Sequence, residues 1–259
     1  MREMVKSGMG TAMAALNPQC RYGKCIFVIA HMRCGSTALS NILCSRPDVS
    51  GYGEAHIRYD GGGALGRLAV NQAKRQSWKP RATHLFDKIL HSRHDGAACD
   101  GFFTARAIFV AREPFAAIRS IRKLYDGLGR DEYTTDTAAA EYYIERMETL
   151  LRHWDRFPAD NRVGLTHAAL LAAPEAELER ISTVLRISPP LENRYESRAA
   201  SRKGGAGDPT ASGKFTRIEP RPGGGFAEDG ADLALSPDLR SAAQDVYQRF
   251  RRTIGEPHA

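Results

Sequence analysis

Four residues near the N-terminus, Arg33, Gly35, Ser36 and Thr37, have the types and spacing of a site for an anion. They follow an apolar run at 25–30, CIFVIA, which has the length of a buried parallel strand, and they precede apolar residues at helical spacing. A glycine loop between a strand and a helix directs backbone N–H groups and the positive helix end to one point. Arg33 adds a permanent cation, and Gly35 lets the backbone approach the ligand closely. The two hydroxyls add hydrogen bonds, so the loop suits a phosphate or sulfate group.

The same loop is a poor match to an ATP-binding loop. The pattern GxxxxGK[ST] would begin here at Ala30, and Ser36 then stands where the lysine belongs. We find no convincing magnesium-binding carboxylate after a strand. An ordinary glycine turn in which Ser36 caps the helix is the other interpretation of the loop. A second anion-binding motif is needed to decide between these interpretations.

Together with Cys34, these residues resemble the donor-binding loop of the sulfotransferase superfamily. Its members bind the 5′-phosphosulfate of the sulfuryl donor 3′-phosphoadenosine 5′-phosphosulfate (PAPS) with a loop that ends in a basic residue, Ser or Thr, Gly, Ser or Thr, and Thr. Residues 33–37 fit this pattern, and Cys34 is the one departure from it. The resemblance implies that Arg33, Cys34, Gly35, Ser36 and Thr37 bind PAPS.

A second motif lies in the segment AIFVAREPFAAIRSI, which begins at residue 107. In the superfamily, an Arg at the end of a later strand and a Ser eight residues further on hold the 3′-phosphate of the donor. Arg112 and Ser120 have this spacing, Pro114 suits the first turn of a helix, and Glu113 replaces the more usual Asp. Either residue alone would be an ordinary surface or helix residue. Two anion sites at strand ends are what a nucleotide with phosphates at both its 3′ and 5′ positions requires, whereas ATP needs only one.

Sulfuryl transfer needs a base for the acceptor, and this sequence offers three candidates for it. The segment RPDVSGYGEAHI resembles the stretch of tyrosylprotein sulfotransferases in which Pro-Asp-Val is followed by Gly-Glu, and Glu54 then matches the catalytic base. His56 is a rival, because an imidazole needs little adjustment to act as a base near neutral pH. His91 is a second rival, because cytosolic relatives place their catalytic histidine in a similar region between the two motifs. Without the resemblance, each would be an ordinary loop or strand-end residue.

The leaving phosphate also needs a cation. Lys88 follows Asp87 on a predicted strand, much as a lysine does in the tyrosylprotein enzymes, and the resemblance implies that it stabilises the developing negative charge. We expect Arg33 to share this role. The alternative for Lys88 is a salt bridge with Asp87 or another neighbour. Thr166 and His167 lie where relatives often carry a Tyr-Glu pair before a helix, and the sequence alone assigns them no role.

A third segment, RKGGAGDP at 202–209, resembles the RKGxxGD segment that covers the nucleotide in cytosolic sulfotransferases. Pro209 stands in place of the usual Trp, and a GDP segment followed by a lysine, here Lys214, occurs in some bacterial relatives. The resemblance implies cofactor contacts for Arg202, Lys203, Gly204 and Lys214. A flexible basic linker is an equally good interpretation.

The elements that would position these residues alternate between strand and helix. Apolar runs predict strands at 25–30, 84–90, 107–111 and 162–165. Helical spacing predicts helices at 36–46, 65–76, 114–125, 137–157, 175–185 and 237–250. This alternation predicts a three-layer α/β/α domain with a mainly parallel sheet, similar to P-loop NTPases, whose ligand lies beyond the carboxyl ends of its strands. We expect a loosely ordered leader at 1–23 and a single domain at 24–259, with an irregular covering region at 188–235.

The composition is that of a globular protein, with 42% hydrophobic and 26% charged residues. Lys and Arg outnumber Asp and Glu by 37 to 30, and the resulting charge of +7 suits an anionic ligand. The basic residues are spread along the chain without an RNA-binding signature, so we expect no nucleic-acid partner. The five cysteines lack paired CxxC spacing, and we expect no metal. Because we find neither a signal-peptide core nor a membrane-spanning apolar run, we predict a cytoplasmic protein with no membrane partner.

These observations together predict a PAPS-dependent sulfotransferase. We expect in-line transfer of a sulfuryl group to a hydroxyl or amine of a small-molecule, carbohydrate or tyrosyl acceptor, with a carboxylate base and no metal. The lack of a targeting segment favours a small metabolite or carbohydrate, and a homodimer is left open. The alternatives are a variant P-loop kinase or NTPase, and a nucleotide-binding or basic nucleic-acid-binding protein without turnover.

Overall fold

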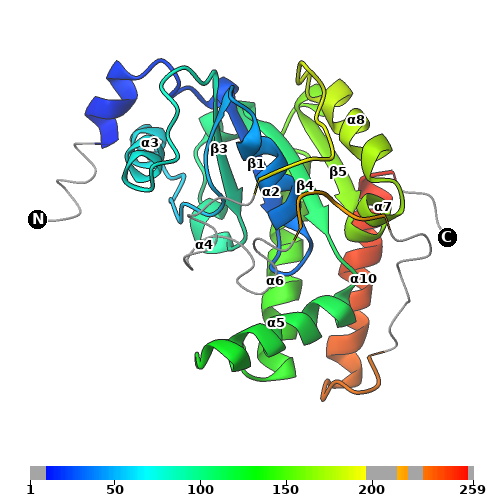
Figure 1. Ribbon diagram of the computed structural model, residues 1–259. Helices are drawn as coiled ribbons and strands as arrows, with labels where there is room; N and C mark the ends of the chain where they lie inside the picture. Colours follow the sequence, from blue (N-terminus) through cyan, green and yellow to red (C-terminus); the bar gives the residue numbers. More distant parts are fainter. Residues whose placement is uncertain (1–9, 197–214, 221–229, 256–259) are drawn as a thin grey trace, which may run out of the picture.

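Five parallel strands form the central sheet of the computed structural model, which describes residues 10–196, 215–220 and 230–255. The strand order is β2-β3-β1-β4-β5 (Figure 1). The strands are β1 (Cys25–Ala30), β2 (Val49–Ser50), β3 (His84–Ile89), β4 (Arg106–Ala111) and β5 (Arg162–Thr166). Every residue of β1 is buried, which explains why its sequence is apolar throughout rather than alternating.

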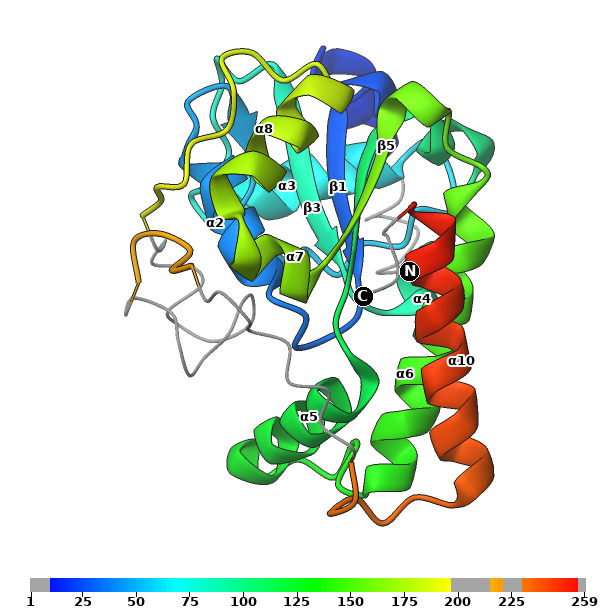
Figure 2. The same cartoon turned by 90° about the vertical axis from the view of Figure 1, so that its right-hand side faces the viewer.

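Helices cover both faces of this sheet, as Figure 2 shows: α2, α7 and α8 lie on one face, and α6 and α10 lie on the other. The helices are α2 (Ser36–Ser45), α3 (Ala64–Lys74), α4 (Ser92–Asp95), α5 (Pro114–Leu128), α6 (Asp136–Trp154), α7 (His167–Ala172), α8 (Pro174–Val184) and α10 (Pro237–Thr253). Short 3-10 helices lie at Tyr22–Lys24, Asp100–Thr104 and Ala159–Asn161. The three-layer α/β/α architecture and the parallel sheet predicted from the sequence are confirmed.

The alternation of side chains along each strand decides which residues face which helices. Neighbouring residues of a strand point to opposite faces of the sheet. Lys88 of β3 points toward α2, where its ammonium lies 3.3 Å from the Thr37 hydroxyl. Phe109 of β4 points to the opposite face, where its ring packs at 5.2 Å against Trp154 of α6. Asp87, which precedes Lys88, therefore points away from α2.

A buried arginine of α6, Arg146, contacts both α4 and the carboxyl ends of two central strands. Arg146 donates to both carboxylate oxygens of Asp95 on α4, at 2.7 and 2.9 Å, and both side chains are fully buried. The same guanidinium donates to the carbonyls of Ala30, at the end of β1, and of Ile89, at the end of β3, both at 2.9 Å. These contacts satisfy the charge and the strand-end carbonyls that burial would otherwise leave unpaired.

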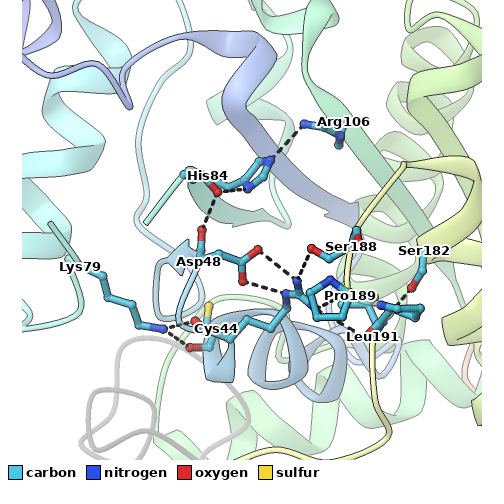
Figure 3. A network of polar contacts seen from close by, with 12 residues as sticks. Cys44, Asp48, Lys79, His84, Arg106, Ser182, Ser188, Pro189 and Leu191 are labelled. Carbon is cyan, nitrogen blue, oxygen red and sulfur yellow. Dashed lines mark hydrogen bonds and ion pairs between the residues drawn. The ribbon is translucent and has the colours of Figure 1, made fainter. Parts of the chain in front are cut away.

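Another network, at the amino end of the sheet, holds the chain that follows α8 (Figure 3). Arg46, just past α2, forms a forked ion pair with Asp48, at 2.9 and 3.0 Å. Its remaining N–H groups donate to the carbonyls of Pro189 and Ser188, at 2.7 and 3.2 Å. The Asp48 carbonyl in turn accepts from the backbone N–H of His84, at the start of β3. Residues 188–191 are thus anchored although they form no helix or strand.

Part of the segment expected to be a loose leader is packed onto the domain. Residues 10–16 are helical, and the buried Gln19 side chain donates to the carbonyls of Lys79, Pro80 and Ala82 at 2.7 to 3.2 Å. The described parts of 188–235 form neither helix nor strand. Two of them lie side by side, because the Tyr195 N–H donates to the Thr216 carbonyl at 2.7 Å. The residues Arg202, Lys203, Gly204 and Lys214 lie outside the described residues.

Candidate active site

The loop between β1 and α2 has the bent backbone that an anion site requires. Arg33 and Gly35 both adopt left-handed conformations, with φ of 66° and 84°. A left-handed conformation is costly for arginine and free for glycine, so Arg33 is held there by its surroundings. Gly35 also has no room for a side chain, because an added Cβ would lie 2.7 Å from the His167 ring. The loop then enters α2 at Ser36, whose side chain is buried, so the positive end of α2 lies at the loop.

The structure brings the two predicted phosphate motifs together. Arg33 Nε donates to the Ser120 hydroxyl on α5 at 2.9 Å, although the two residues are 87 positions apart. Arg112, just past β4, donates from its guanidinium to the Arg33 carbonyl at 3.3 Å. Because β1 and β4 are neighbours in the sheet, their carboxyl ends place both arginines at one edge.

Electrostatics at this edge favour an anion. Burial, and next the charge of Arg33, lowers the pKa of the Arg112 guanidinium. Two partly desolvated cations this close repel each other, and a bound phosphate would relieve that repulsion. Cys34, between the two left-handed residues, is fully buried, and burial raises the pKa of its thiol. It therefore contributes an uncharged side chain to the inside of the loop.

Glu113 has a structural role beside these arginines. Its carboxylate accepts hydrogen bonds from the backbone N–H groups of Phe115 and Ala116, at 3.1 and 2.8 Å, and so caps α5. Burial raises the pKa of this carboxyl, although the two backbone donors oppose the shift. The residue that replaces the usual Asp thus starts the helix that carries Ser120.

A second group of predicted residues meets beside the same loop. Lys88 on β3 lies 3.4 Å from the Glu54 carboxylate and 3.3 Å from the Thr37 hydroxyl. The Lys88 side chain is 2% exposed and that of Glu54 is 15% exposed, so the pair lies at the rim of the core. The structure thus brings the Glu54 carboxylate, the Lys88 ammonium and the Thr37 hydroxyl together beside the loop.

Asp87, which the sequence offers only as a partner for Lys88, has a different role. The two side chains point to opposite faces of β3, and the Asp87 carboxylate accepts hydrogen bonds from the Ala55 N–H at 2.8 Å and the Tyr59 hydroxyl at 2.6 Å. It also accepts from the Lys88 N–H at 2.9 Å. Burial raises the pKa of Asp87 to about 7 against the effect of these donors. Asp87 therefore fixes the backbone on either side of the Glu54–Lys88 pair.

The two rival bases lie in a row of histidines next to Tyr142. The rings of His91 and Tyr142 are 5.4 Å apart, those of His91 and His94 6.3 Å, and those of His94 and His56 5.6 Å. His56 is exposed and has a left-handed backbone, with φ of 54°. Burial lowers the pKa of His91 to about 3, which makes it a weaker base than an ordinary histidine.

Two more histidines lie at the loop between β1 and α2, and the sequence assigned a role to neither. His167 begins α7 directly after β5, and its ring packs on Gly35. His31 follows β1 directly and is fully buried. The signal that both carry is their position, since each is the first residue after the carboxyl end of a parallel strand.

Comparisons with known proteins agree with the fold and with the family resemblance. Residues 64–190 match the model of the sulfotransferase family. The chain also superimposes on the sulfotransferase domain of the Synechococcus PCC 7002 olefin synthase, with a TM-score of 0.62, 17% identity, and coverage of 90% of this chain and 97% of that domain. The resemblance to the sulfotransferase superfamily is confirmed. No curated protein sequence matches the chain significantly.

Other solved sulfotransferases share the fold. The sulfotransferase domain from the curacin biosynthetic pathway has a TM-score of 0.57 and 16% identity, with coverage of 88% of this chain and 98% of that domain. Sulfotransferase STF9 from Mycobacterium avium has a TM-score of 0.52 and 12% identity, with coverage of 99% and 86%. The family match includes Lys88, Arg112 and Ser120, whereas residues 33–37 and Glu54 precede it.

The described residues hold neither a metal-binding cluster nor a membrane-spanning helix. No group of three or more His, Cys, Asp or Glu side chains in this part of the chain is arranged to hold a metal ion. Among the same residues, no helix is both long and apolar enough to cross a bilayer.

Proposed function

We propose that this protein transfers a sulfuryl group from PAPS to a hydroxyl or amine of a small-molecule or carbohydrate acceptor. The family match and the fold support sulfuryl transfer in general. The observation that carries the choice of donor is the contact between Arg33 and Ser120, with Arg112 beside them. It joins the two sites that we propose for anions, at the ends of neighbouring strands, and a nucleotide phosphorylated at both its 3′ and 5′ positions needs two such sites.

The residues present fit such a donor. Residues 33–37 would hold the 5′-phosphosulfate with backbone N–H groups, the Arg33 guanidinium and the hydroxyls of Ser36 and Thr37. Arg112 and Ser120 would hold the 3′-phosphate. When bound, PAPS supplies an activated sulfuryl group on a phosphate leaving group.

The Glu54–Lys88 pair supplies the two charges that the transfer needs. Glu54 accepts the proton of the acceptor hydroxyl or amine as the new S–O or S–N bond forms. Lys88, held between Glu54 and Thr37, stabilises the negative charge that develops on the leaving phosphate. Because Lys88 contacts both the base and the donor loop, it also sets the distance between them.

Calorimetry with the product nucleotide 3′-phosphoadenosine 5′-phosphate (PAP) tests the choice of donor. We expect micromolar binding of PAP and much weaker binding of ATP with magnesium. Arg112→Ala should weaken PAP binding by about tenfold to a hundredfold, because it removes a charge-assisted contact. A folded protein that binds no PAP at high micromolar concentration, or that is stabilised more by ATP than by PAP, would overturn the proposal.

Transfer of labelled sulfate from PAPS to a panel of acceptors tests turnover. Sugars, phenols, other small metabolites and tyrosyl peptides form the panel, and we expect a small metabolite or a carbohydrate to be labelled. PAP binding without labelling of any acceptor would instead support a nucleotide-binding protein without turnover.

A further inference from the structure

His31 is a fully buried histidine in a single protonation state. Its Nδ1 lies 2.7 Å from the Met32 carbonyl oxygen, and its Nε2 accepts a hydrogen bond from the Arg112 backbone N–H at 2.9 Å. A carbonyl oxygen can only accept, so Nδ1 carries the hydrogen and Nε2 does not. Burial lowers the pKa of His31 to about 3, in agreement with a neutral ring. The ring thus donates to one segment and accepts from another.

The two segments that His31 connects are the two halves of the proposed donor site. Met32 precedes Arg33 in the loop for the 5′-phosphosulfate, and Arg112 is the residue proposed for the 3′-phosphate. The pairing of β1 with β4 extends to Ala30, which lies opposite Val110. Beyond this pair the His31 ring continues the connection between the two segments, because its Nε2 accepts a hydrogen bond from the Arg112 N–H.

Tyr143 of α6 completes the support of this link. Its ring packs edge-on against the His31 ring, with centroids 4.8 Å apart, and its hydroxyl donates to the Arg112 carbonyl at 2.8 Å. Both polar groups of the Arg112 backbone are thus held by side chains from other elements. The guanidinium of Arg112 then reaches the Arg33 carbonyl from a fixed starting point.

We propose that His31 is a positioning residue that sets the separation of the two phosphate sites and so makes the protein selective for a nucleotide with phosphates at both ends. This inference rests on the proposed function. A ligand with two phosphates gains from both sites only when their separation matches its own. A ligand with one phosphate does not depend on that separation, so loss of the His31 link should weaken only the doubly phosphorylated ligand.

Two substitutions separate this role from simple packing. His31→Leu fills the space but has no group to accept from the Arg112 N–H. His31→Gln keeps an amide oxygen that can accept from Arg112 and an amide N–H that can donate to Met32. Calorimetry measures the affinity of each variant for PAP, adenosine 5′-phosphate and adenosine 3′-phosphate.

We expect His31→Leu to weaken PAP binding by about tenfold, the effect of one lost buried hydrogen bond, and to change the affinity for either monophosphate by less than about threefold. His31→Gln should retain PAP affinity within about threefold of the unmodified protein. Equal weakening of all three ligands, unchanged PAP affinity in His31→Leu, or failure of His31→Gln to restore it would each overturn the inference.

A third variant keeps the test decisive if His31→Leu does not fold. Tyr143→Phe removes only the hydroxyl that holds the Arg112 carbonyl and keeps the ring against His31. It should also weaken PAP more than either monophosphate, and an equal effect on all three ligands would contradict the inference. Binding of PAP by the unmodified protein tests the proposed function separately. If that protein binds no PAP, both proposals fail, whereas normal PAP binding with insensitive variants overturns only the role of His31.

Discussion

At the scale of single residues, the carboxylate of Glu54 is the group on which the proposed chemistry depends. Its ammonium partner, Lys88, is almost fully buried, and Asp87 holds the backbone N–H groups of Ala55 and Lys88 on either side of the pair. The proposed base is thus positioned by Lys88 on β3 and, through Ala55, by Asp87 on the same strand. By contrast, the rival base His56 is exposed, and its ring packs beside that of His94.

Glu54→Gln should lower the turnover of an identified acceptor by about a hundredfold or more, because the amide cannot take the acceptor proton. The affinity for PAP should stay within about twofold, since Glu54 is not among the residues proposed to hold the donor. Sulfate-transfer kinetics and calorimetry measure the two effects. The matched variants His56→Gln and His91→Gln serve as the comparison, and a larger loss of turnover in either one would move the assignment of the base to that histidine.

Gly35→Ala tests whether the donor loop needs its backbone geometry. The added methyl group would require a left-handed alanine and would lie 2.7 Å from the His167 ring. We expect PAP binding to weaken by at least about tenfold, and the variant Gly127→Ala, on a helix position with open space, to leave it unchanged. Normal PAP binding by Gly35→Ala would show that the loop does not cradle the nucleotide.

At the scale of elements, α6 holds the carboxyl ends of the strands that carry the site. Three of its side chains serve this purpose. Tyr142 accepts from the Met32 N–H and donates to the Leu90 carbonyl, at 2.9 and 2.7 Å, while Tyr143 and Arg146 hold the ends of β4, β1 and β3. One amphipathic helix therefore sets the relative positions of the donor loop, the Lys88 strand and Arg112.

Arg146→Met should destabilise the protein by about 3 to 5 kcal/mol, because it leaves the buried Asp95 carboxylate without its cation. The matched control is Arg249→Met, which removes the exposed ion pair between α10 and Glu148 of α6 and should cost less than about 1 kcal/mol. Urea unfolding followed by circular dichroism measures both. Similar losses in the two variants would show that the buried pair contributes no more than the surface pair.

At the scale of the whole molecule, buried and half-buried histidines link stability to pH. Burial is the main cause that lowers the pKa of His31 and His91 to about 3 and that of His94 to about 4, from 6.5. Below about pH 6.5 the unfolded chain binds protons at these positions and the folded chain does not, so stability falls as the pH is lowered. Asp87 acts in the opposite direction between about pH 4 and 7, because its folded-state pKa is raised from 3.8 to about 7.

Burial also lowers the pKa of His84 and raises that of Glu113. We therefore expect the unfolding temperature to fall between pH 7 and pH 5, since the four histidines outweigh the two carboxyls. His31→Gln should make this dependence shallower by about one proton, and Asp87→Asn should make it steeper. Differential scanning calorimetry across this range measures the slopes. An unfolding temperature that is constant or rises on acidification would contradict the burial of these neutral rings.

Local patterns in the chain were sufficient for the fold. Strands at 25–30, 84–90, 107–111 and 162–165 were predicted within about one residue of their observed bounds, since a run of apolar residues is a direct consequence of burial on both faces. Short elements escaped prediction, among them β2, α4 and α7, because two to six residues carry no readable period. The packing of residues 10–23 depends on distant carbonyls that accept hydrogen bonds from Gln19, and such contacts cannot be predicted from a local sequence pattern.

The arginine, glycine and hydroxyl residues of the proposed donor loop were evident from the sequence, because their types and spacing are themselves the signal. The tertiary structure decided what these residues contact. It placed Arg33 on Ser120 across 87 positions and Lys88 on Glu54, and it showed Asp87 to point to the other face of its strand. It also placed His31 and His167 at the loop. The contacts of a histidine that follows a strand cannot be inferred until the neighbouring strand is known. Chemical type is thus local in the chain, whereas distance and protonation state arise only when separate segments are packed together.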